Sequence, residues 1–442
     1  MHLKRLEFYI GKLSKKGDIN MSINPVVRVS QKFDEGNDIG LITSGEDKYI
    51  YDSDGKKYLD FCGGIWNMPF GYTNLAINEK IIKQLNKLPF CNLVTNIADI
   101  QHNYAVRLCK IIGTGAVLYT CSGSESIEAA IKTCRKYQAI KKSSRKGISA
   151  FPLSYHGTTY GAMSVSGIDQ VLLEDYFPLL DNIMWIDLPK DLQDEDIWIE
   201  VVENHFKKNA ENMAGIIIEP IFGSGGIVPI PEKVFKRIQE LCSSNDILLV
   251  VDEVTTGFGR TGIPFAFQRY GIKPDLICLS KGISNGYLPL GALAFSNRVV
   301  ETFIEKDATL EHFSTQGGNL ISIAAADAVL DLMEHYEDYE VAAKGEYMVN
   351  YLKQLLGSYK SISVRGTGLM IGISFPKDLD AERLLDVWAK IRKRGLLVYI
   401  FSNPGYNLGL SLFPPFTSTK DDLKKAADKI VSLLKRYPDI VY

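Results

Sequence analysis

Short apolar segments alternate with amphipathic segments between about residues 100 and 300, and this alternation constrains the fold more than any other feature. Several of the apolar segments are apolar on both faces, as strands must be when helices cover both sides of a sheet. The pattern predicts α/β architecture with a mostly parallel central sheet flanked by helices. The predicted strands are AVLYT (116–120), ISAFPLSY (148–155), AGIIIEPI (214–221), DILLVVDE (246–253) and DLICLS (275–280).

The pattern changes after about residue 325. One long helical stretch over 324–355 is followed by short strands and a closing helix over 421–436, whose start Thr419 can cap. Near the other end of the chain, YIYDSDGKKYLDF (49–61) predicts a β-hairpin. We therefore expect a large domain over 70–325 and a smaller α+β domain built from 21–69 and 326–442, with an N-terminal extension over 1–20. The sequence leaves open whether translation starts at Met1 or Met21.

Three charged residues directly follow predicted buried segments. Glu219 follows AGIII, Asp252 follows LLVV, and Lys281 follows LICLS. A charge in such a place costs free energy unless it is paired or hydrogen-bonded. Because ligands of open α/β sheets bind outside the carboxyl ends of the strands, we expect these residues to face one site. Taken singly, the carboxylates are also consistent with exposed loops and the lysine with an ordinary surface position.

Two further strand ends carry residues that suit an anion and a flat ring. Gly123 and Ser124 lie in CSGSES at the start of a predicted helix, where free N–H groups and the helix dipole favour a phosphate. Tyr155 lies at the exit of its predicted strand, where its ring can stack on a ligand. An ordinary capped turn and a core tyrosine remain alternatives, and His156 is open between a structural and a catalytic role.

Together these residues match the groups of pyridoxal 5'-phosphate, which has a phosphate, a flat ring, a basic ring nitrogen and an aldehyde. Asp252 would pair with the protonated ring nitrogen, an interaction worth roughly 1.5–3 kcal/mol. Lys281 would form a Schiff base, helped by burial that lowers its pKa, and its freed amine would then move a proton at the substrate.

Composition argues against several classes of protein. The net charge of −2, without a long run of one sign, gives no nucleic-acid surface. The seven scattered cysteines suit reduced thiols in the cytoplasm. No apolar run reaches the roughly 18 residues of a membrane span, and the first 20 residues are a poor signal peptide. No clustered metal-ligand motif occurs, and 366–372 departs by one residue from a dinucleotide fingerprint. We expect a soluble cytoplasmic protein without a metal.

Eight stretches, in order over roughly residues 40–420, closely resemble the class III, fold-type I, pyridoxal-phosphate-dependent aminotransferases. They are YLDFCGGIWNMPFGY, CSGSESIEAAIK, YHGTTYGAMSVSG, IIIEPIFGSGG, VVDEVTTGFGRTG, LSKGISNGYLPLGA, STQGGNLISIAAA and VRGTGLMIGISF. The resemblance implies that Lys281 binds the cofactor aldehyde and that Asp252 binds the ring nitrogen. It likewise implies that Gly123 and Ser124 bind the phosphate.

The resemblance also assigns residues around the ring and the substrate. Tyr155 and Val254 match the residues on the two ring faces, and Glu219 matches a supporting acid. Trp66, with Tyr155, would line the substrate pocket. Thr315 matches a threonine that binds the phosphate of the neighbouring subunit, which implies a homodimer with shared active sites.

One segment departs from the family pattern. Many relatives carry an arginine that binds a substrate carboxylate just before a Pro-Pro pair, whereas LGLSLFPPF has Ser411 near that position and no arginine lies between Arg394 and Arg436. We therefore expect at least one substrate to lack a carboxylate there.

The expected activity is ping-pong transfer of an amino group between an amino donor and a ketone, aldehyde or oxo-acid. An aminomutase or racemase of the same family would share Lys281 and Asp252 and remains an alternative. The intact pair argues against a third reading, a catalytically silent cofactor-binding regulator.

Overall fold

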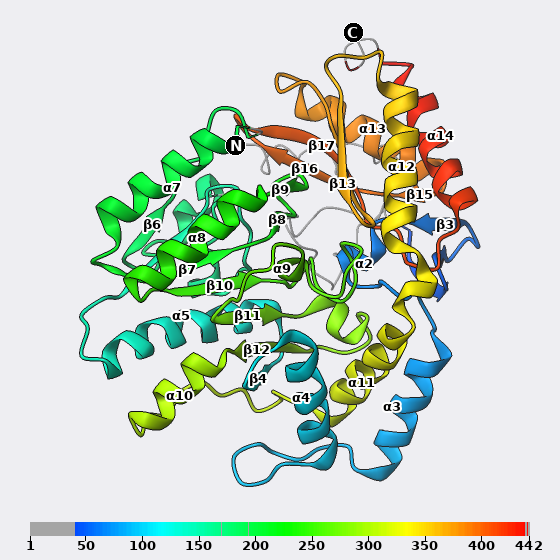
Figure 1. Ribbon diagram of the computed structural model, residues 1–442. Coiled ribbons are helices and arrows are strands. Elements are labelled where there is room, and N and C mark those ends of the chain that lie inside the picture. The colour runs from blue at the N-terminus through cyan, green and yellow to red at the C-terminus, as the bar shows by residue number, and fades with distance from the viewer. Residues whose placement is uncertain (1–39, 169, 193, 438–439, 441–442) are drawn as a thin grey trace.

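A seven-stranded sheet forms the centre of the protein in the computed structural model, which describes residues 40–168, 170–192, 194–437 and 440 (Figure 1). Strand β12 runs antiparallel to both of its neighbours, and the other strand pairs are parallel. The expected α/β fold with a mostly parallel sheet is confirmed. The strand order is β4 (Ala116–Thr120), β12 (Gly291–Phe295), β11 (Leu276–Leu279), β10 (Leu248–Asp252), β7 (Met213–Ile218), β5 (Gly147–Ala150) and β6 (Ile183–Trp185).

Both faces of this sheet are covered, which explains why its strands are apolar throughout. On β10, Leu248 and Val250 pack into one core with residues of α5, whereas Leu249 and Val251 belong to the larger core on the other face. The helices that flank the sheet or follow it are α3 (Leu75–Lys87), α4 (Asp99–Ile112), α5 (Gly123–Ile140), α6 (Tyr160–Ser164), α7 (Glu195–Asn209), α8 (Glu232–Asn245), α9 (Ala266–Arg269), α10 (Asn297–Glu305) and α11 (Leu320–Glu334). Short 3₁₀ helices cover Gln170–Tyr176 and Lys281–Ser284.

The strand directions bring six carboxyl ends to one edge of the sheet. Strands β5, β6, β7, β10 and β11 are parallel to one another. Strand β4 has the same direction, because it is antiparallel to the reversed β12. Residues that follow these six strands therefore meet at one rim, as expected for a ligand site in such a sheet.

Two predicted segments need correction. ISAFPLSY forms a strand only as far as Ala150, because Pro152 cannot donate a hydrogen bond to a neighbouring strand. Tyr155 consequently lies in an irregular segment, five residues beyond the strand end. AGIIIEPI is interrupted after Ile218 and resumes as the short β8 (Ile221–Phe222), which pairs with β9 (Val228–Pro229). Strands β12 and β6 were not predicted.

The C-terminal part forms a separate four-stranded antiparallel sheet with helices against it. Its order is β13 (Ser363–Thr367), β14 (Met370–Ser374), β17 (Asn407–Leu412) and β16 (Tyr399–Asn403). The helices are α12 (Val341–Leu356), α13 (Ala381–Lys393) and α14 (Lys420–Leu434). The capping box predicted at the start of α14 is present: Thr419 Oγ1 accepts from the Asp422 N–H at 3.1 Å, and Asp422 accepts from the Thr419 N–H at 2.9 Å.

The single long helix expected over 324–355 is wrong, because α11 and α12 are separate helices. A 3₁₀ turn at Tyr336–Tyr339 and a left-handed Glu340 (φ 48°) divide them. Tertiary contacts hold this break, since the Tyr336 hydroxyl donates to the Gly259 carbonyl at 2.6 Å. Helical periodicity continues across the break, and the sequence alone therefore did not reveal it.

Both chain ends contribute to a third sheet. The predicted hairpin at 49–61 is present as β2 (Tyr49–Asp52) and β3 (Lys57–Asp60), joined by β1 (Ile42–Glu46) on one side and by β15 (Leu396–Leu397) on the other. A short turn, α2 (Gly63–Trp66), leads from β3 toward the rim of the large sheet. The domain boundaries at 70 and 325 stay a prediction, and residues 1–20 and 21–39 lie outside the described residues.

Candidate functional site

Lys281 follows β11 and points into the space beside Trp66. Its backbone is left-handed (φ 46°), its Nζ lies 2.7 Å from Thr255 Oγ1, and the same Nζ lies 4.7 Å from the centroid of the Trp66 ring. Burial lowers the pKa of this amine, against the opposing effect of the Asp252 and Glu219 carboxylates. The neutral amine, which is the nucleophilic form, is therefore favoured more than in a lysine exposed to water.

Asp252 ends β10, next to the strand that leads to Lys281. Its side chain is buried and accepts hydrogen bonds from the Val254 N–H at 3.0 Å and from His156 Nδ1 at 2.7 Å. An ionised carboxylate only accepts hydrogen bonds, so this pair places a proton on Nδ1. His156 Nε2 is buried without a hydrogen-bond partner among the described residues. Two hydrogen-bond donors thus hold the Asp252 carboxyl group at the rim.

Glu219 follows β7 and closes the side of the cluster near Trp66. It accepts hydrogen bonds from the Tyr155 N–H at 2.9 Å and the Gly223 N–H at 3.0 Å. Burial raises the pKa of Glu219 to about 7; the electrostatic effect of His156 opposes this rise, and that of Asp252 adds to it. Glu219 is thus a carboxyl group that can hold or release a proton near neutral pH.

Gly123 and Ser124 form the first turn of α5, directly after β4. Ser122 caps the helix by accepting from the Glu125 N–H at 3.2 Å. A Cβ on Gly123 would lie 3.1 Å from both methyl groups of Val254, so glycine lets this turn approach the end of β10. Ser124 Oγ accepts from the Thr158 N–H at 3.3 Å. This turn is the N-terminus of the 18-residue helix α5, and it packs against the loop that follows Asp252.

Tyr155 and Val254 flank the cluster from opposite segments. Tyr155 is 36% exposed, so its ring is accessible, and its main chain is held by Glu219. Val254 is partly buried and lies next to Gly123. The structure thus brings these two residues to the same rim as Lys281 and Asp252.

Trp66 forms an apolar wall beside Lys281. Its ring stacks on Phe413 with centroids 4.6 Å apart and meets Tyr399 edge-on at 5.4 Å. Trp66 and Phe413 belong to one buried apolar cluster with Ile221, Ile227 and Met370.

Ser411 lies on the same face of β17 as this wall, two residues before Phe413 and directly opposite Tyr399. It is 1% exposed, and its Oγ has no hydrogen-bond partner among the described residues. The position expected for a carboxylate-binding arginine is therefore a small hydroxyl at an apolar wall.

Thr315 is exposed, and within the described ranges it makes no hydrogen bond to the residues above. The preceding Ser314 lies 3.2 Å from Cys121 through Oγ and Sγ, so this loop runs close to the turn at Gly123. The structure brings the other predicted site residues together and leaves Thr315 on the adjoining surface.

Sequence reasoning missed Thr255, the hydrogen-bond partner of Lys281, and left His156 undecided. Both follow predicted strands, in YHG and DEVTTG, and that position was the available signal. Which of several polar residues in such a loop turns toward the rim depends on tertiary packing, so the signal did not single them out.

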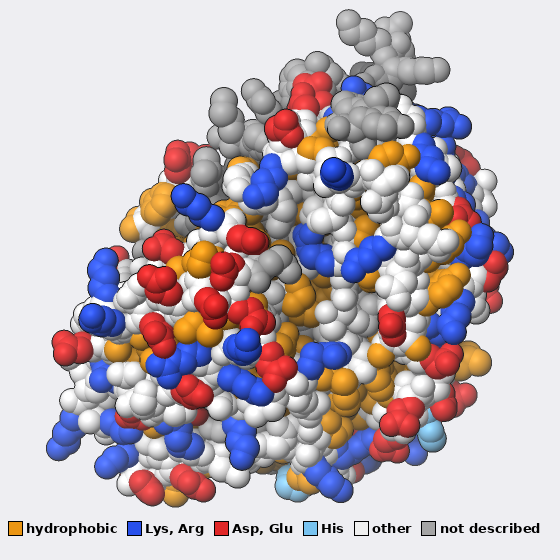
Figure 2. Space-filling model, turned by 45° about the horizontal axis from the view of Figure 1, so that its top comes forward, with side chains coloured by type: hydrophobic (Ala, Val, Ile, Leu, Met, Phe, Trp, Pro, Cys, Tyr) orange, Lys and Arg blue, Asp and Glu red, His pale blue; other side chains and the backbone are white. Residues whose placement is uncertain are grey.

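The described residues offer neither a metal site nor a membrane-spanning helix beside this cluster. No group of three or more His, Cys, Asp and Glu residues is placed to hold a metal ion, and no helix of the described chain is long and apolar enough to cross a membrane. Lys and Arg side chains are interspersed with Asp and Glu side chains on the face seen in Figure 2.

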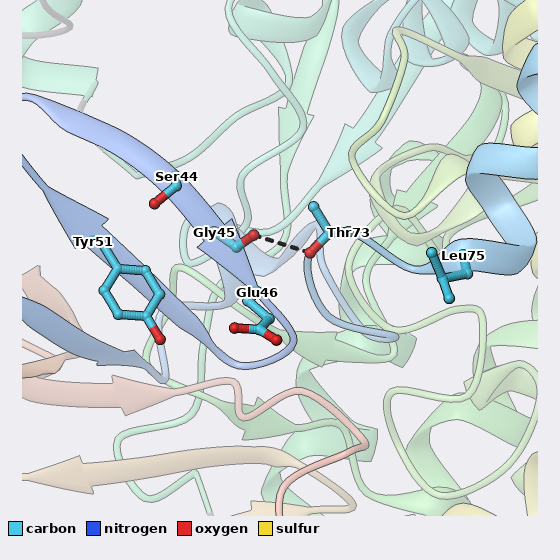
Figure 3. A pocket seen from close by; sticks show the side chains of 6 residues that line it. All are labelled: Ser44, Gly45, Glu46, Tyr51, Thr73 and Leu75. Atoms are coloured by element: carbon cyan, nitrogen blue, oxygen red, sulfur yellow. Dashed lines mark hydrogen bonds between the residues drawn. The ribbon is translucent and has the colours of Figure 1, made fainter.

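A surface cavity of about 540 Å³ lies beside the β1–β2 hairpin and contains none of the predicted site residues. Figure 3 shows its lining, in which Thr73 Oγ1 donates to the Gly45 carbonyl at 2.9 Å.

Comparison with known proteins decides the family. The family model "Aminotransferase class-III" matches residues 32–434. The chain belongs to the class III aminotransferases. It is 33% identical to the acetylornithine aminotransferase of Aquifex aeolicus, over 88% of this chain and 96% of the relative. It is also 33% identical to the uncharacterized aminotransferase YhxA of Bacillus subtilis, over 87% of this chain and 89% of the relative.

Solved structures agree with this membership and with the fold-type I architecture. An amine transaminase from an uncultivated Pseudomonas species, solved with pyridoxal phosphate bound, superimposes with a TM-score of 0.85 at 29% identity, over 96% of this chain and 100% of the other. An (S)-enantioselective omega-transaminase from Thermomicrobium roseum gives a TM-score of 0.85 at 28% identity, over 95% and 97%. This class III enzyme is therefore an aminotransferase, and the family implies pyridoxal phosphate as its cofactor.

Glu253, the residue after Asp252, provides a test of how strongly the rim is desolvated. It is fully buried and accepts hydrogen bonds from Thr256 Oγ1 and the Phe267 N–H, both at 2.6 Å. Burial raises the pKa of Glu253 to about 7 from an ordinary value of 4.5.

We predict that Glu253→Gln makes stability less dependent on pH between 5 and 7. In this interval the folded wild type retains a proton that the unfolded chain releases, so each added pH unit lowers its free energy of unfolding by about 1 kcal/mol. Glutamine has no such proton. Urea unfolding at pH 5, 6 and 7 measures the slopes, with the exposed Glu232→Gln as control. Equal slopes for wild type and Glu253→Gln would contradict the prediction.

Proposed function

We propose that pyridoxal 5'-phosphate binds at the rim of the seven-stranded sheet, between Lys281 and Asp252. The observation that carries this assignment is the placement of a buried carboxylate and a desolvated amine at the ends of the adjacent strands β10 and β11, with Asp252 in register with Cys278. A cationic ring nitrogen suits Asp252, which among the described residues accepts side-chain hydrogen bonds from the Val254 N–H and His156 only.

The remaining residues fit the other groups of the cofactor. The turn at Gly123 and Ser124 presents helix N–H groups to a phosphate, and the Cβ-free Gly123 keeps that turn close to the rim. Tyr155 and Val254 both lie at this rim, and we assign them to the two faces of the cofactor ring, as the family resemblance implies. Glu219 sits near the Lys281 end, with a pKa at which it can share a proton.

Pyridoxal phosphate supplies an aldehyde that takes up the amino group and a ring that delocalises the electrons released at the substrate's Cα. Lys281 holds the cofactor and then, as a free amine, moves a proton to and from Cα, with Thr255 Oγ1 orienting its Nζ. Asp252 keeps the ring nitrogen protonated, and His156 keeps Asp252 in place through Nδ1. The same steps in the reverse order, with a carbonyl acceptor in place of the donor's product, would complete ping-pong amino transfer.

We predict that Lys281→Ala abolishes the visible absorbance of the holoenzyme and lowers turnover at least about 100-fold, because both the covalent link and the base are lost. Absorption spectra and single-turnover rates with an amine donor measure the two effects. The exposed Lys306→Ala serves as the control and should match the wild type. Retention of both the spectrum and the rate by Lys281→Ala would refute the assignment.

We further propose that one substrate is an amine or carbonyl compound without a carboxylate beside Ser411. Trp66, Met370 and Phe413 make this wall apolar, and Ser411 offers a hydroxyl instead of a guanidinium. An unpaired carboxylate buried there would pay a large desolvation cost. The similarity to solved amine transaminases supports a substrate of this kind.

We predict that Ser411→Arg shifts selectivity toward amino acids that carry a second carboxylate. A new charge-assisted pair should raise kcat/KM for such substrates at least about tenfold relative to simple amines. Ser411→Ala should keep the wild-type preference, and the visible spectrum reports whether each variant still binds the cofactor. A wild type that turns over only dicarboxylic amino acids, with simple amines inert, would overturn the proposal.

A homodimer with shared sites is also proposed. Val94 and Ile97 are 69% and 70% exposed in the segment between α3 and α4, and Phe313 is 65% exposed two residues before Thr315. These segments adjoin each other, because Gln101 Nε2 donates to the carbonyls of both Cys91 and Gly318. Figure 1 shows α3, α4 and α11 gathered on one side of the molecule. Exposed apolar surface of this kind is typical of an interface, and Phe313 places part of it two residues from Thr315.

We predict that mixed dimers reveal the shared site. Thr315→Glu should repel the phosphate bound by the other subunit, and Lys281→Ala inactivates its own site. A mixed dimer contains one Thr315→Glu chain and one Lys281→Ala chain. It keeps one complete site, in which the first chain supplies Lys281 and the second supplies Thr315. Co-expression with two different tags, purification of mixed dimers and activity assays should recover about half of wild-type activity, given sites that act independently. No recovery, or a monomer in sedimentation, would refute sharing.

We place the enzyme in the cytoplasm as part of the same proposal. The seven cysteines form no disulfide in the described chain, which suits a reducing compartment.

A further inference from the structure

The segment that carries Trp66 has an unusual backbone conformation. Gly63, Gly64, Ile65 and Trp66 have φ angles of 58°, 59°, 58° and 67°, and all four lie in the left-handed region. The Trp66 N–H donates to the Cys62 carbonyl at 2.9 Å, and the Asn67 N–H donates to the Gly63 carbonyl at 2.8 Å. The chain therefore makes a turn of left-handed helix, which is unfavourable for every residue type except glycine.

Ile65 is the most strained residue of this turn. A β-branched side chain with positive φ is a true outlier, because Cβ crowds the following carbonyl. Burial does not compensate for this strain, since the Ile65 side chain is 58% exposed. The conformation must therefore be held by contacts from outside the residue itself.

Asp60 supplies those contacts. Its Oδ1 accepts hydrogen bonds from the Cys62 and Gly63 N–H groups at 2.9 and 3.1 Å, and its Oδ2 accepts from the Gly64 N–H at 2.9 Å. The Tyr72 hydroxyl also donates to Oδ2. Asp60 is 2% exposed, so the carboxylate gives up its water to gather four donors. Successive N–H groups aimed at one anion form a recognised anion-binding concavity.

The turn is also locked to the wall of the pocket. A Cβ on Gly63 would lie 2.7 Å from the Phe413 carbonyl oxygen, and the Phe413 N–H donates to the Phe61 carbonyl at 2.7 Å. Trp66 then stacks on Phe413, and Lys281 Nζ lies 4.7 Å from the Trp66 ring centroid. The backbone held by Asp60 thus determines where Trp66 stands relative to the reactive lysine.

We propose that Asp60 is a positioning residue: its carboxylate stabilises the strained left-handed turn and thereby sets Trp66 as the wall of the substrate pocket. The role of Trp66 as that wall rests on the function proposed above. Asp60 itself does not contact the substrate, and its effect passes through the backbone of Gly63 and Gly64.

The same chain contains a matched control. Asp52 is also buried and accepts from two main-chain N–H groups, those of Asp54 and Lys56, and from one tyrosine hydroxyl, that of Tyr58. It stabilises the β2–β3 hairpin, which does not carry Trp66. Asp52→Asn therefore makes the same chemical change as Asp60→Asn without touching the left-handed turn.

The first experiment reads the position of Trp66 without using activity. The near-UV circular dichroism of Trp66 is the difference between a protein and the same protein with Trp66→Phe. This difference should fall to less than half in Asp60→Asn. The asparagine NH₂ would face main-chain N–H groups that cannot accept a hydrogen bond, and the turn would lose part of its support. It should be unchanged in Asp52→Asn. An unchanged Trp66 signal in folded Asp60→Asn would overturn the proposal.

The second experiment asks whether strain is what Asp60 offsets. Ile65→Gly removes the penalty for positive φ, so Asp60→Asn combined with Ile65→Gly should regain most of the Trp66 signal. If Asp60→Asn does not fold, Tyr72→Phe removes only one of the four donors and should reduce the signal partly, again with recovery by Ile65→Gly. Failure of Ile65→Gly to restore the signal in either background would overturn the strain argument.

The third measurement connects position to selectivity. The ratio of kcat/KM for a small amine and a bulky amine should change at least tenfold in Trp66→Gly and in Asp60→Asn. The double variant should show no further change, because both act through the same wall. Additive effects would show that Asp60 acts elsewhere. A Trp66→Gly enzyme with wild-type selectivity would instead refute the proposed pocket, while the circular dichroism result would still decide the role of Asp60.

Discussion

Removal of charged groups from water at one rim of the sheet is the constraint on which the rest of the structure depends. Asp252, Glu219 and Lys281 lie at the ends of strands whose other residues are buried aliphatics, and each is stabilised by specific partners. Burial favours the neutral forms of Lys281 and Glu219. The Asp252 carboxyl group, on the adjacent strand, accepts hydrogen bonds from the Val254 N–H and from His156.

The wall of the site comes from segments far apart in the chain. Trp66 belongs to the N-terminal part and Phe413 to the C-terminal part, and they stack beside a lysine carried by the central sheet. The C-terminal sheet is in turn fastened to the Asp252 loop by Arg260, whose Nη1 donates to the carbonyls of Leu369 and Pro414 at 3.1 and 2.6 Å. Burial lowers the pKa of Arg260 to about 9, so this link carries an electrostatic cost. The two hydrogen bonds to main-chain carbonyls offset part of this cost.

Part of the backbone strain of the described chain lies at the same place. Lys281, Ile65 and Trp66 all have positive φ, and all three lie at or beside the proposed pocket. Strain of this kind persists only where surrounding contacts over-determine the conformation. Here the contacts are the carboxylate of Asp60 for the turn at Trp66, and Thr255 for the Lys281 side chain.

The sequence by itself determined the α/β class and most of the central strands, because strands buried on both faces are apolar throughout. It also determined that Lys281, Asp252, Glu219 and Gly123 lie at strand ends, because charged residues and a glycine-containing turn directly follow these apolar runs. Tertiary structure alone decided where ISAFPLSY stops, that α11 and α12 separate at Glu340, which loop residues face Lys281 and how Trp66 is held. These outcomes depend on hydrogen bonds between distant segments, such as Tyr336 with Gly259. Periodicity records which face of an element is buried and carries no information about such partners.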